Sequence, residues 1–264
     1  MKHLQCYLGI LQGDLDALIE WCNINGMQIN ASKCKVMSFY RGDSPIIHNY
    51  SAGDRLLEHV KSIKDLGIIV DRKLDFKEQL LVSTSRARST LGFIWRNTQE
   101  FKDIQTLKCL YVTLVRSILE YGVQVWAPRL IGNMNLFEGV QRTATRLILR
   151  RLPVSNPARQ FNYEERLRFL HMDKLSLRVS FLRRMFMFDI VNGCSDCEAL
   201  TSMLPFHAPA RTLREVDPLR VPNDGHRSFF NPFYECCKCF NSVTGKFDYG
   251  MSKLSFKNRI RGLS

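Results

Sequence analysis

The sequence contains no stretch of about 18 apolar residues, the minimum for a membrane-spanning helix. Its first eleven residues hold one lysine and a short apolar patch interrupted by His3, Gln5 and Gly9. The small-residue cleavage pattern of a secretory signal is absent from this segment. We therefore expect an intracellular protein, cytoplasmic or nuclear and not secreted, without a membrane partner and without a small-molecule substrate.

Acidic residues are scarce relative to basic ones. The chain has 25 aspartates and glutamates against 38 lysines and arginines, a formal net charge of +13 and a pI near 9.5. Arginine, whose planar guanidinium binds phosphate through two parallel hydrogen bonds, outnumbers lysine 24 to 14. The excess is concentrated between Arg142 and Arg184, where 11 basic and three acidic residues give a local charge of +8. This distribution predicts a polyanionic partner such as nucleic acid.

The nine cysteines are an odd number at ordinary density, so a disulfide framework is not expected. A zinc site is the alternative, since thiolates in two paired groups can form a closed tetrahedral cage. The spacing is unfavourable, because 38 residues of proline-rich sequence separate the two cysteine groups. We therefore expect reduced thiols and no metal site. The residues of the zinc alternative are Cys194, Cys197, Cys236, Cys237 and Cys239, with His207 and His226 as substitutes.

The first 74 residues predict one helix followed by short strands. Apolar residues repeat with helical spacing between Asp14 and Asn25, with Asp14 as the expected N-cap and Gly26 as the expected stop. Short apolar runs bounded by turn residues follow. We expect these runs to form a small antiparallel sheet or a pair of hairpins, and they span residues 35–40, 46–50, 60–63 and 66–70.

From Asp75 onward the apolar period is helical. The expected helices span residues 76–101, 103–125, 136–152, 163–170 and 174–192. The second should bury a stripe formed by Leu107, Leu110, Leu114 and Ile118. Five prolines after Leu204 favour loops with short helices at best. The expected fold is α+β with three domains: a helix and small sheet (1–74), a mostly helical bundle (75–204) and an irregular C-terminal extension (205–264).

Five sequence blocks occur in a family-like order. They are LQGDLDALIEWCNINGMQINASKCKVMSF at 11–39, LGIIVD at 66–71, LGFIWR at 91–96, LVRSILEYGVQVWAP at 114–128 and FEGVQRTATRLIL at 137–149. Together these blocks resemble the reverse transcriptases of non-LTR retrotransposons of the LINE and jockey type. The resemblance covers roughly the first two-thirds of the chain and continues more loosely over 231–260.

The resemblance implies that residues 1–74 correspond to the polymerase palm after its catalytic turn, and residues 75–204 to the helical thumb. In the family, two adjacent aspartates ahead of this segment hold magnesium ions. This sequence contains no Asp-Asp dipeptide. Asp14 and Asp16 cannot converge on one metal ion, because side chains two residues apart on a helix do not face each other. We expect a truncated transposable-element fragment that is inactive alone and binds no cofactor.

Two further positions acquire roles from the resemblance. Lys33, in the string Asn30-Ala31-Ser32-Lys33, resembles the palm lysine proposed to protonate the leaving pyrophosphate. Its alternative is a solvated lysine at the entry to a strand. Leu66 and Gly67 resemble the primer-grip hairpin, where a small residue lets the primer end approach the backbone. Their alternative is an ordinary bend in a strand.

Arg142, Arg146 and Arg150 recur every four residues and therefore share one helix face. By resemblance, the thumb follows the template–primer duplex through phosphate contacts, which position nucleic acid without reading its sequence. The alternative is a basic face that is solvated or paired internally with Glu138, Glu164 or Glu165. Two functions remain: a polymerase fragment that is inactive alone, or a basic module that binds an RNA/DNA hybrid through its thumb-like surface. The sequence does not indicate an oligomeric state.

Overall fold

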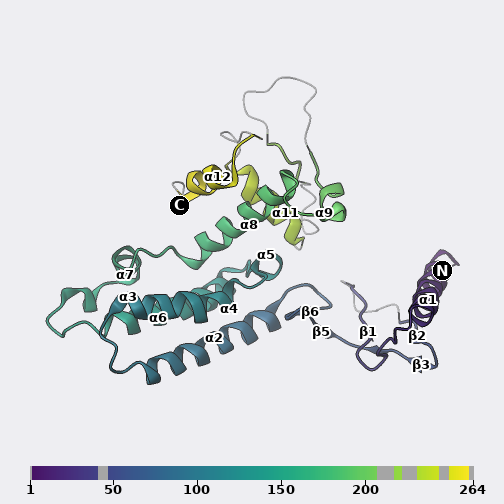
Figure 1. Ribbon diagram of the computed structural model, residues 1–264, viewed down its shortest axis with the longest axis horizontal. Helices are drawn as coiled ribbons and strands as arrows, with labels where there is room; N and C mark the ends of the chain where they lie inside the picture. Colours follow the sequence, from purple (N-terminus) through teal and green to yellow (C-terminus); the bar gives the residue numbers. More distant parts are fainter. Residues whose placement is uncertain (1, 41–46, 207–216, 222–230, 244–249, 262–264) are drawn as a thin grey trace. The chain divides into compact units, whose positions relative to one another are not determined.

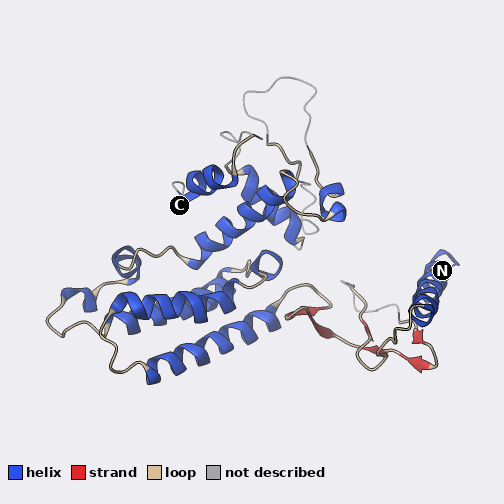
Figure 2. Cartoon of the chain, viewed as in Figure 1, coloured by secondary structure: helices blue, strands red, loops and turns tan. Residues whose placement is uncertain are grey.

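The computed structural model describes residues 2–40, 47–206, 217–221, 231–243 and 250–261. The α+β fold class expected from the sequence is confirmed: helices dominate, and a few short strands form small sheets (Figures 1 and 2). The chain divides into two compact units, Met1–Phe76 and Lys77–Ser264. The described segments after residue 204 belong to the second unit. No helix among the described residues is long and apolar enough to cross a membrane.

The first unit begins with helix α1, Lys2–Ile24, which is longer than expected. The prediction that Asp14 caps its N-terminus is wrong, because the helix continues through this position. Gly9 and Gly13 lie inside the helix and do not end it, although each glycine costs about 1 kcal/mol relative to alanine. The expected stop is confirmed: Gly26 has a φ of +68°, and the Met27 N–H donates to the Cys22 carbonyl at 2.8 Å.

The named strands of the first unit form three separate two-stranded pieces. Two pieces are antiparallel as expected, but β1 pairs with β4 in parallel. In that pair Lys35 lies opposite Glu58, and their side chains form an ion pair of 2.6 Å that lowers the pKa of the Glu58 carboxyl. Residues 47–50, expected as part of a strand, have no regular structure, and residues 41–46 lie outside the described ranges. The strands are β1 (Lys35–Val36), β2 (Ser51–Ala52), β3 (Arg55–Leu56), β4 (Glu58–His59), β5 (Ser62–Asp65) and β6 (Ile68–Asp71).

The second unit is a helical bundle in which α2 packs along α6 (Figure 1). Most of the helices expected between residues 76 and 192 are present, with ends shifted by a few residues. The elements are α2 (Lys77–Asn97), α3 (Ile104–Leu110), the π-helical η1 (Tyr111–Arg116), α4 (Ser117–Glu120), α5 (Val123–Trp126), α6 (Ile131–Leu149), the 3₁₀ helix η2 (Pro157–Gln160), α7 (Tyr163–Phe169), α8 (Leu175–Val191), α9 (Glu198–Ser202), α11 (Pro232–Asn241) and α12 (Lys253–Arg261).

The helix expected at 103–125 is interrupted, and of its predicted buried stripe only Leu107 is fully buried. Leu114 is 48% exposed, and the buried residues are Leu107, Tyr111, Val115 and Leu119. The π-helical segment widens the turn in the middle of this stretch, so side chains four residues apart remain on one face. Gly122, with a φ of +59°, then separates α4 from α5.

A buried carboxylate on α6 connects this helix to two others. Glu138 is only 5% exposed. Its side chain accepts hydrogen bonds from the Leu175 N–H at 3.1 Å, the Ser176 N–H at 3.3 Å and the Tyr163 hydroxyl. The two amides open the first turn of α8, whose own N-cap residue Lys174 provides no side-chain hydrogen bond. Glu138 therefore caps α8 from a neighbouring helix, where a negative charge is favoured by the helix dipole.

Gln141, one turn further along α6, is fully buried and extends the same network. Its carbonyl oxygen accepts a hydrogen bond from the Tyr111 hydroxyl at 3.0 Å. Its amide nitrogen donates to the Asp173 carbonyl at 2.9 Å and to the Tyr163 hydroxyl oxygen at 3.1 Å. The network therefore fixes η1, α7 and the start of α8 around one face of α6.

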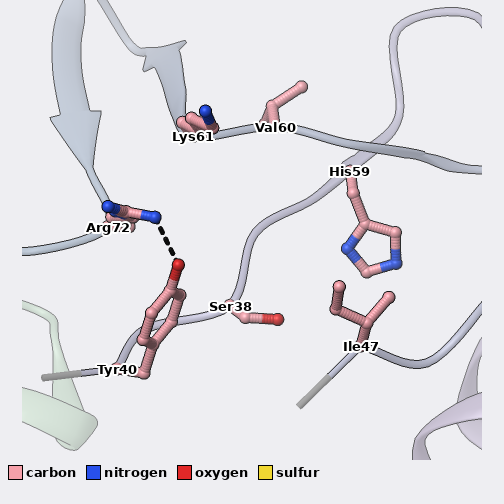
Figure 3. Close-up of a pocket in the computed structure, with 7 residues that line it drawn as sticks. All are labelled: Ser38, Tyr40, Ile47, His59, Val60, Lys61 and Arg72. Atoms are coloured by element: carbon pink, nitrogen blue, oxygen red, sulfur yellow. Dashed lines mark hydrogen bonds between the residues drawn. The ribbon is translucent and has the colours of Figure 1, made fainter. Parts of the chain in front are cut away.

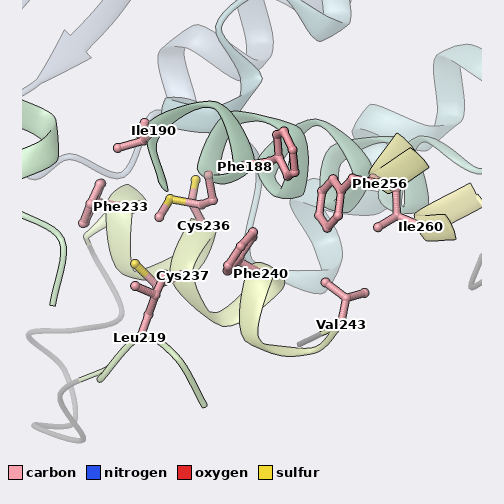
Figure 4. Close-up of a cluster of buried hydrophobic side chains, with 11 residues drawn as sticks. Phe188, Ile190, Leu219, Phe233, Cys236, Cys237, Phe240, Val243, Phe256 and Ile260 are labelled. Atoms are coloured by element: carbon pink, nitrogen blue, oxygen red, sulfur yellow. The ribbon is translucent and has the colours of Figure 1, made fainter. Parts of the chain in front are cut away.

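The described C-terminal segments include the short helices α11 and α12, in agreement with the expectation of short helices in this region. Helices α11 and α12 pack against α8 around an apolar cluster (Figure 4). The rings of Phe188 and Phe256 stack with their centroids 4.6 Å apart, and Phe240 lies beside Phe256. This burial stabilises short helices that have little stability in isolation. The other buried members of the cluster are Met187, Ile190, Leu219, Phe233, Cys236, Cys237, Val243 and Ile260.

We expect Glu138→Ala to lower the free energy of unfolding by about 2–4 kcal/mol, because it leaves the Tyr163 hydroxyl and two helix amides without their acceptor. Urea denaturation followed by circular dichroism measures this change. The control is Glu164→Ala, which removes an exposed ion pair with Lys174 and should cost less than about 1 kcal/mol. Equal losses in the two variants would contradict the capping role.

Candidate nucleic-acid interface

Helix α6 has one buried face and one basic face. Phe137, Val140, Ala144 and Ile148 pack in the core, whereas the side chains of Arg142, Arg146 and Arg150 are all exposed. Because the three arginines recur every four residues, they form a row along the helix. We call these three residues the arginine row.

The glutamates considered as internal partners of the arginine row all have other partners. Glu138 caps α8, and Glu164 pairs with Lys174 at 2.6 Å. Glu165 accepts a hydrogen bond from the Asn162 N–H at 2.7 Å within a capping box. Among the described residues, none of the observed ion pairs involves the arginine row. Its three charges are therefore available to a partner anion.

Helix α7 adds a fourth guanidinium that the sequence pattern did not reveal. The Arg142 guanidinium lies 5.2 Å from the ring centroid of Tyr163, and that of Arg166 lies 5.7 Å from the same centroid. Burial lowers the pKa of Arg166, and the positive charges of Arg146 and Arg142 lower it further. The spacing of Tyr163 and Arg166 on their own helix gave no signal of this, because the contact depends on how α7 packs against α6.

Helix α2 contributes a fifth guanidinium beside the row. A nitrogen of Arg88 lies 3.9 Å from the position that a Cβ atom would occupy on Gly139, one turn before Arg142. Arg151, by contrast, has a structural role. Its guanidinium lies 3.8 Å from the ring centroid of Trp95 and donates to the backbone carbonyls of Gln99 at 3.0 Å and Trp95 at 3.2 Å. Arg151 thus links the end of α6 to α2.

The two sequence-predicted positions of the first unit lie in exposed turns. Lys33 is exposed in the turn before β1, where its N–H donates to the Asn30 carbonyl at 2.9 Å. Leu66 and Gly67 form the two-residue turn between β5 and β6, since Asp65 pairs with Ile68. Their φ values are +45° and +84°, and the Leu66 side chain is 84% exposed. A leucine is unfavourable in this left-handed conformation.

The first unit also contains a pocket of about 160 Å³ (Figure 3). Arg72 is held inside the unit, because it donates a hydrogen bond to the Tyr40 hydroxyl and its guanidinium lies 5.0 Å from the Tyr40 ring centroid. His59 is also engaged, through a 2.8 Å hydrogen bond to the His48 carbonyl. The lining residues are Ser38, Tyr40, Ile47, His59, Val60, Lys61 and Arg72. Because these side chains already make internal contacts, the pocket is a weaker candidate for a ligand-binding site than the arginine row.

Comparison with known proteins identifies two similar proteins of Drosophila melanogaster. The probable RNA-directed DNA polymerase from transposon BS is 27% identical over 141 residues, and the RNA-directed DNA polymerase from mobile element jockey is 29% identical over 144 residues. The resemblance to jockey-like reverse transcriptases is confirmed. Each match covers 52% of this chain but only 16% and 15% of the respective relative. No family model and no solved structure matches the chain.

The metal pair implied by the reverse-transcriptase resemblance does not fit Asp14 and Asp16, the two carboxylates considered for it from the sequence. Asp14 and Asp16 are exposed on α1, two residues apart, and Asp16 accepts a hydrogen bond from Gln12 at 2.8 Å. Side chains at this spacing diverge, so they do not form a shared magnesium site. Within the described ranges, no three histidine, cysteine, aspartate or glutamate side chains gather as a metal site requires.

The cysteines of the zinc alternative lie in different environments. Cys236 and Cys237 are buried within α11, and burial raises the pKa of each thiol to about 12. Cys194 is exposed. Among the described residues, these cysteines are not part of any group of three or more potential metal ligands. His207 and His226 lie outside the described residues.

We expect Leu66→Asn to stabilise the β5–β6 hairpin by about 0.5–1 kcal/mol, since asparagine tolerates the left-handed conformation better than leucine. Amide hydrogen exchange measures this as slower exchange of the hairpin amides. The matched control is Leu56→Asn, because Leu56 is 68% exposed and has no positive φ. A similar slowing in the control would show that the stabilisation does not come from the turn.

Proposed function

We propose that this chain is part of an RNA-directed DNA polymerase of a non-LTR retrotransposon and that the arginine row contacts the backbone of an RNA/DNA hybrid. The single observation that carries the proposal is the set of three exposed arginines on a helix whose other face is buried. The net charge of +13 and the similarity to two RNA-directed DNA polymerases support a nucleic-acid partner. With this partner we also propose a location inside the cell, in the cytoplasm or nucleus.

The geometry of the arginine row suits a polynucleotide strand. Arg142 and Arg150 are eight positions apart, which corresponds to a rise of about 12 Å along an α-helix. A strand of duplex advances about 3.4 Å per nucleotide, so the row matches about three to four nucleotides. Like charges four residues apart destabilise a helix by tenths of a kcal/mol per pair, and phosphate groups offset this repulsion.

The β5–β6 turn provides a second proposed contact. We assign Leu66 and Gly67 to the primer grip on the basis of the family resemblance, and their position at an exposed two-residue turn is compatible with an approaching strand. For Lys33 we propose a vestigial general-acid position, since this chain lacks the carboxylates that would hold the metal-bound nucleotide beside it. None of these three residues is part of the arginine row.

We expect replacement of Arg142, Arg146 and Arg150 by glutamine to weaken hybrid binding about equally for unrelated sequences, because phosphate contacts carry no sequence information. The slope of log affinity against log salt should flatten by roughly 0.7–0.9 for each phosphate that the variant no longer binds. Fluorescence anisotropy with a labelled hybrid at several salt concentrations measures both quantities.

The matched control replaces three other exposed basic residues, Lys73, Lys102 and Arg259, by glutamine. It removes the same charge from the chain, so a larger effect of the arginine-row variant isolates the contribution of that surface. If both triple variants lose the same affinity, or if neither changes the salt slope, the arginine row is not the interface.

We expect the 264-residue chain alone to extend no primer on an RNA template with magnesium or manganese. The reason is that its sequence lacks the adjacent aspartates that hold the two metal ions. Incorporation of labelled nucleotide is the readout, with an intact reverse transcriptase as the positive control. Template-dependent incorporation by this chain would contradict the expectation. Hybrid binding without extension is the outcome that both candidate functions, the polymerase part and the basic nucleic-acid-binding module, predict for this chain.

A further inference from the structure

Two helices bring their guanidiniums to one aromatic ring. Arg142 on α6 and Arg166 on α7 lie 5.2 and 5.7 Å from the ring centroid of Tyr163. The face of an aromatic ring attracts a cation, and guanidinium groups stack on such faces because they are planar and weakly hydrated. Tyr163 therefore holds two positive charges near each other in the folded chain.

The Tyr163 ring is also held in place through its hydroxyl group. The Tyr163 hydroxyl donates a hydrogen bond to the buried Glu138 carboxylate and accepts one from Gln141 at 3.1 Å. Burial and the hydrogen bond to Glu138 raise the pKa of this hydroxyl well above its usual range, so it remains a protonated donor. Since Glu138 also caps α8, the ring position is fixed by the same contacts that hold three helices together.

Arg166 is oriented by two further hydrogen bonds. Its Nε donates to the Thr145 hydroxyl at 3.2 Å, and one Nη donates to the Phe161 carbonyl at 2.8 Å. Thr145, which accepts the Arg166 Nε hydrogen bond, directly precedes Arg146 on α6. Burial lowers the pKa of Arg166, and the positive charges of Arg146 and Arg142 lower it further. No ion pair in the described part of the chain compensates this group.

We propose that Arg142, Arg146 and Arg166 form one phosphate-binding cluster, that Tyr163 is its positioning residue, and that its ligand is a single backbone phosphate of nucleic acid. The inference rests on the proposed function and deepens it. Guanidiniums from two helices approach a phosphate from different directions, and each forms strong charge-assisted hydrogen bonds with its oxygens. Arg150 lies further along α6 and contacts a separate phosphate.

The first test compares Arg166→Gln with Arg168→Gln, in anisotropy measurements of hybrid binding by the full chain. Both residues lie on α7, and Arg168 is exposed, so the two variants lose the same charge from the same helix. We expect Arg166→Gln to weaken binding about tenfold, the effect of losing one charge-assisted hydrogen bond. Arg168→Gln should change it less than twofold. Equal effects overturn the cluster.

The second test counts phosphates through the salt slope. Replacing all three cluster arginines by glutamine should flatten the slope by roughly 0.7–0.9, the value for one phosphate. A flattening about three times larger means that the three arginines contact three separate phosphates, which overturns the single-phosphate cluster but leaves the proposed interface intact. If the wild-type chain shows no salt-sensitive hybrid binding, both the proposed function and the cluster fail.

The third test separates positioning from stability at Tyr163. Tyr163→Phe keeps the ring and loses the hydroxyl, so we expect a lower melting temperature and nearly wild-type hybrid affinity. Tyr163→Leu also removes the ring, and we expect affinity to fall about as far as in Arg166→Gln. Hybrid affinity that follows the melting temperature in both variants assigns Tyr163 a structural role only and overturns its positioning role.

A thermal-shift arm distinguishes the source of the phosphate. Inorganic phosphate should not raise the melting temperature beyond potassium chloride of equal ionic strength, because a single mobile phosphate lacks the neighbouring contacts of a strand. A rise that disappears in Arg166→Gln identifies free phosphate as the ligand and overturns the backbone assignment.

Discussion

The second unit depends on the buried carboxylate of Glu138. A charge in an apolar interior is costly unless several donors surround it. Here the donors are the first amides of α8 and the Tyr163 hydroxyl. Gln141 continues the network to Tyr111 on the π-helical segment. Because these donors belong to different elements, satisfying one carboxylate determines how the helices pack around α6.

This arrangement explains how α6 can carry a row of like charges. A solvated helix loses stability when arginines recur every four residues, but α6 is held by its buried apolar and polar face. The same contacts place Tyr163 and Arg166 beside Arg142. The buried hydrogen-bond network therefore holds the helices that carry the basic surface, and the position of that surface depends on the network.

Local signals in the sequence predicted much of the fold and the exposed arginine row. Helical periodicity and the stop at Gly26 follow from neighbouring residues, and the spacing of Arg142 and Arg146 by itself defines a shared face. Prediction failed where contacts between residues distant in the sequence determine the structure. The buried stripe around Leu114 was misplaced because a π-helical segment changes the helical phase. The packing of α11 on α8 also depends on contacts between residues far apart in the sequence.

Glu138 shows why the site was only partly predictable. A glutamate four residues from an arginine is typical of a surface ion pair, yet Phe137 and Val140 beside it are fully buried. The buried charge is explained by its hydrogen-bond donors on α7 and α8, which are distant in the sequence. Arg166 was not predicted as part of the site for the same reason, because its proximity to Arg142 requires the packing of α7 on α6.

The most direct test is a structure of the full chain bound to an RNA/DNA hybrid. We expect the guanidiniums of Arg142, Arg146 and Arg166 to lie within about 3 Å of the oxygens of one backbone phosphate, with no contact to base edges. We also expect the Glu138 contacts to remain as they are in the unbound chain. A hybrid bound on another surface, with the arginine row facing solvent, would contradict the proposed interface.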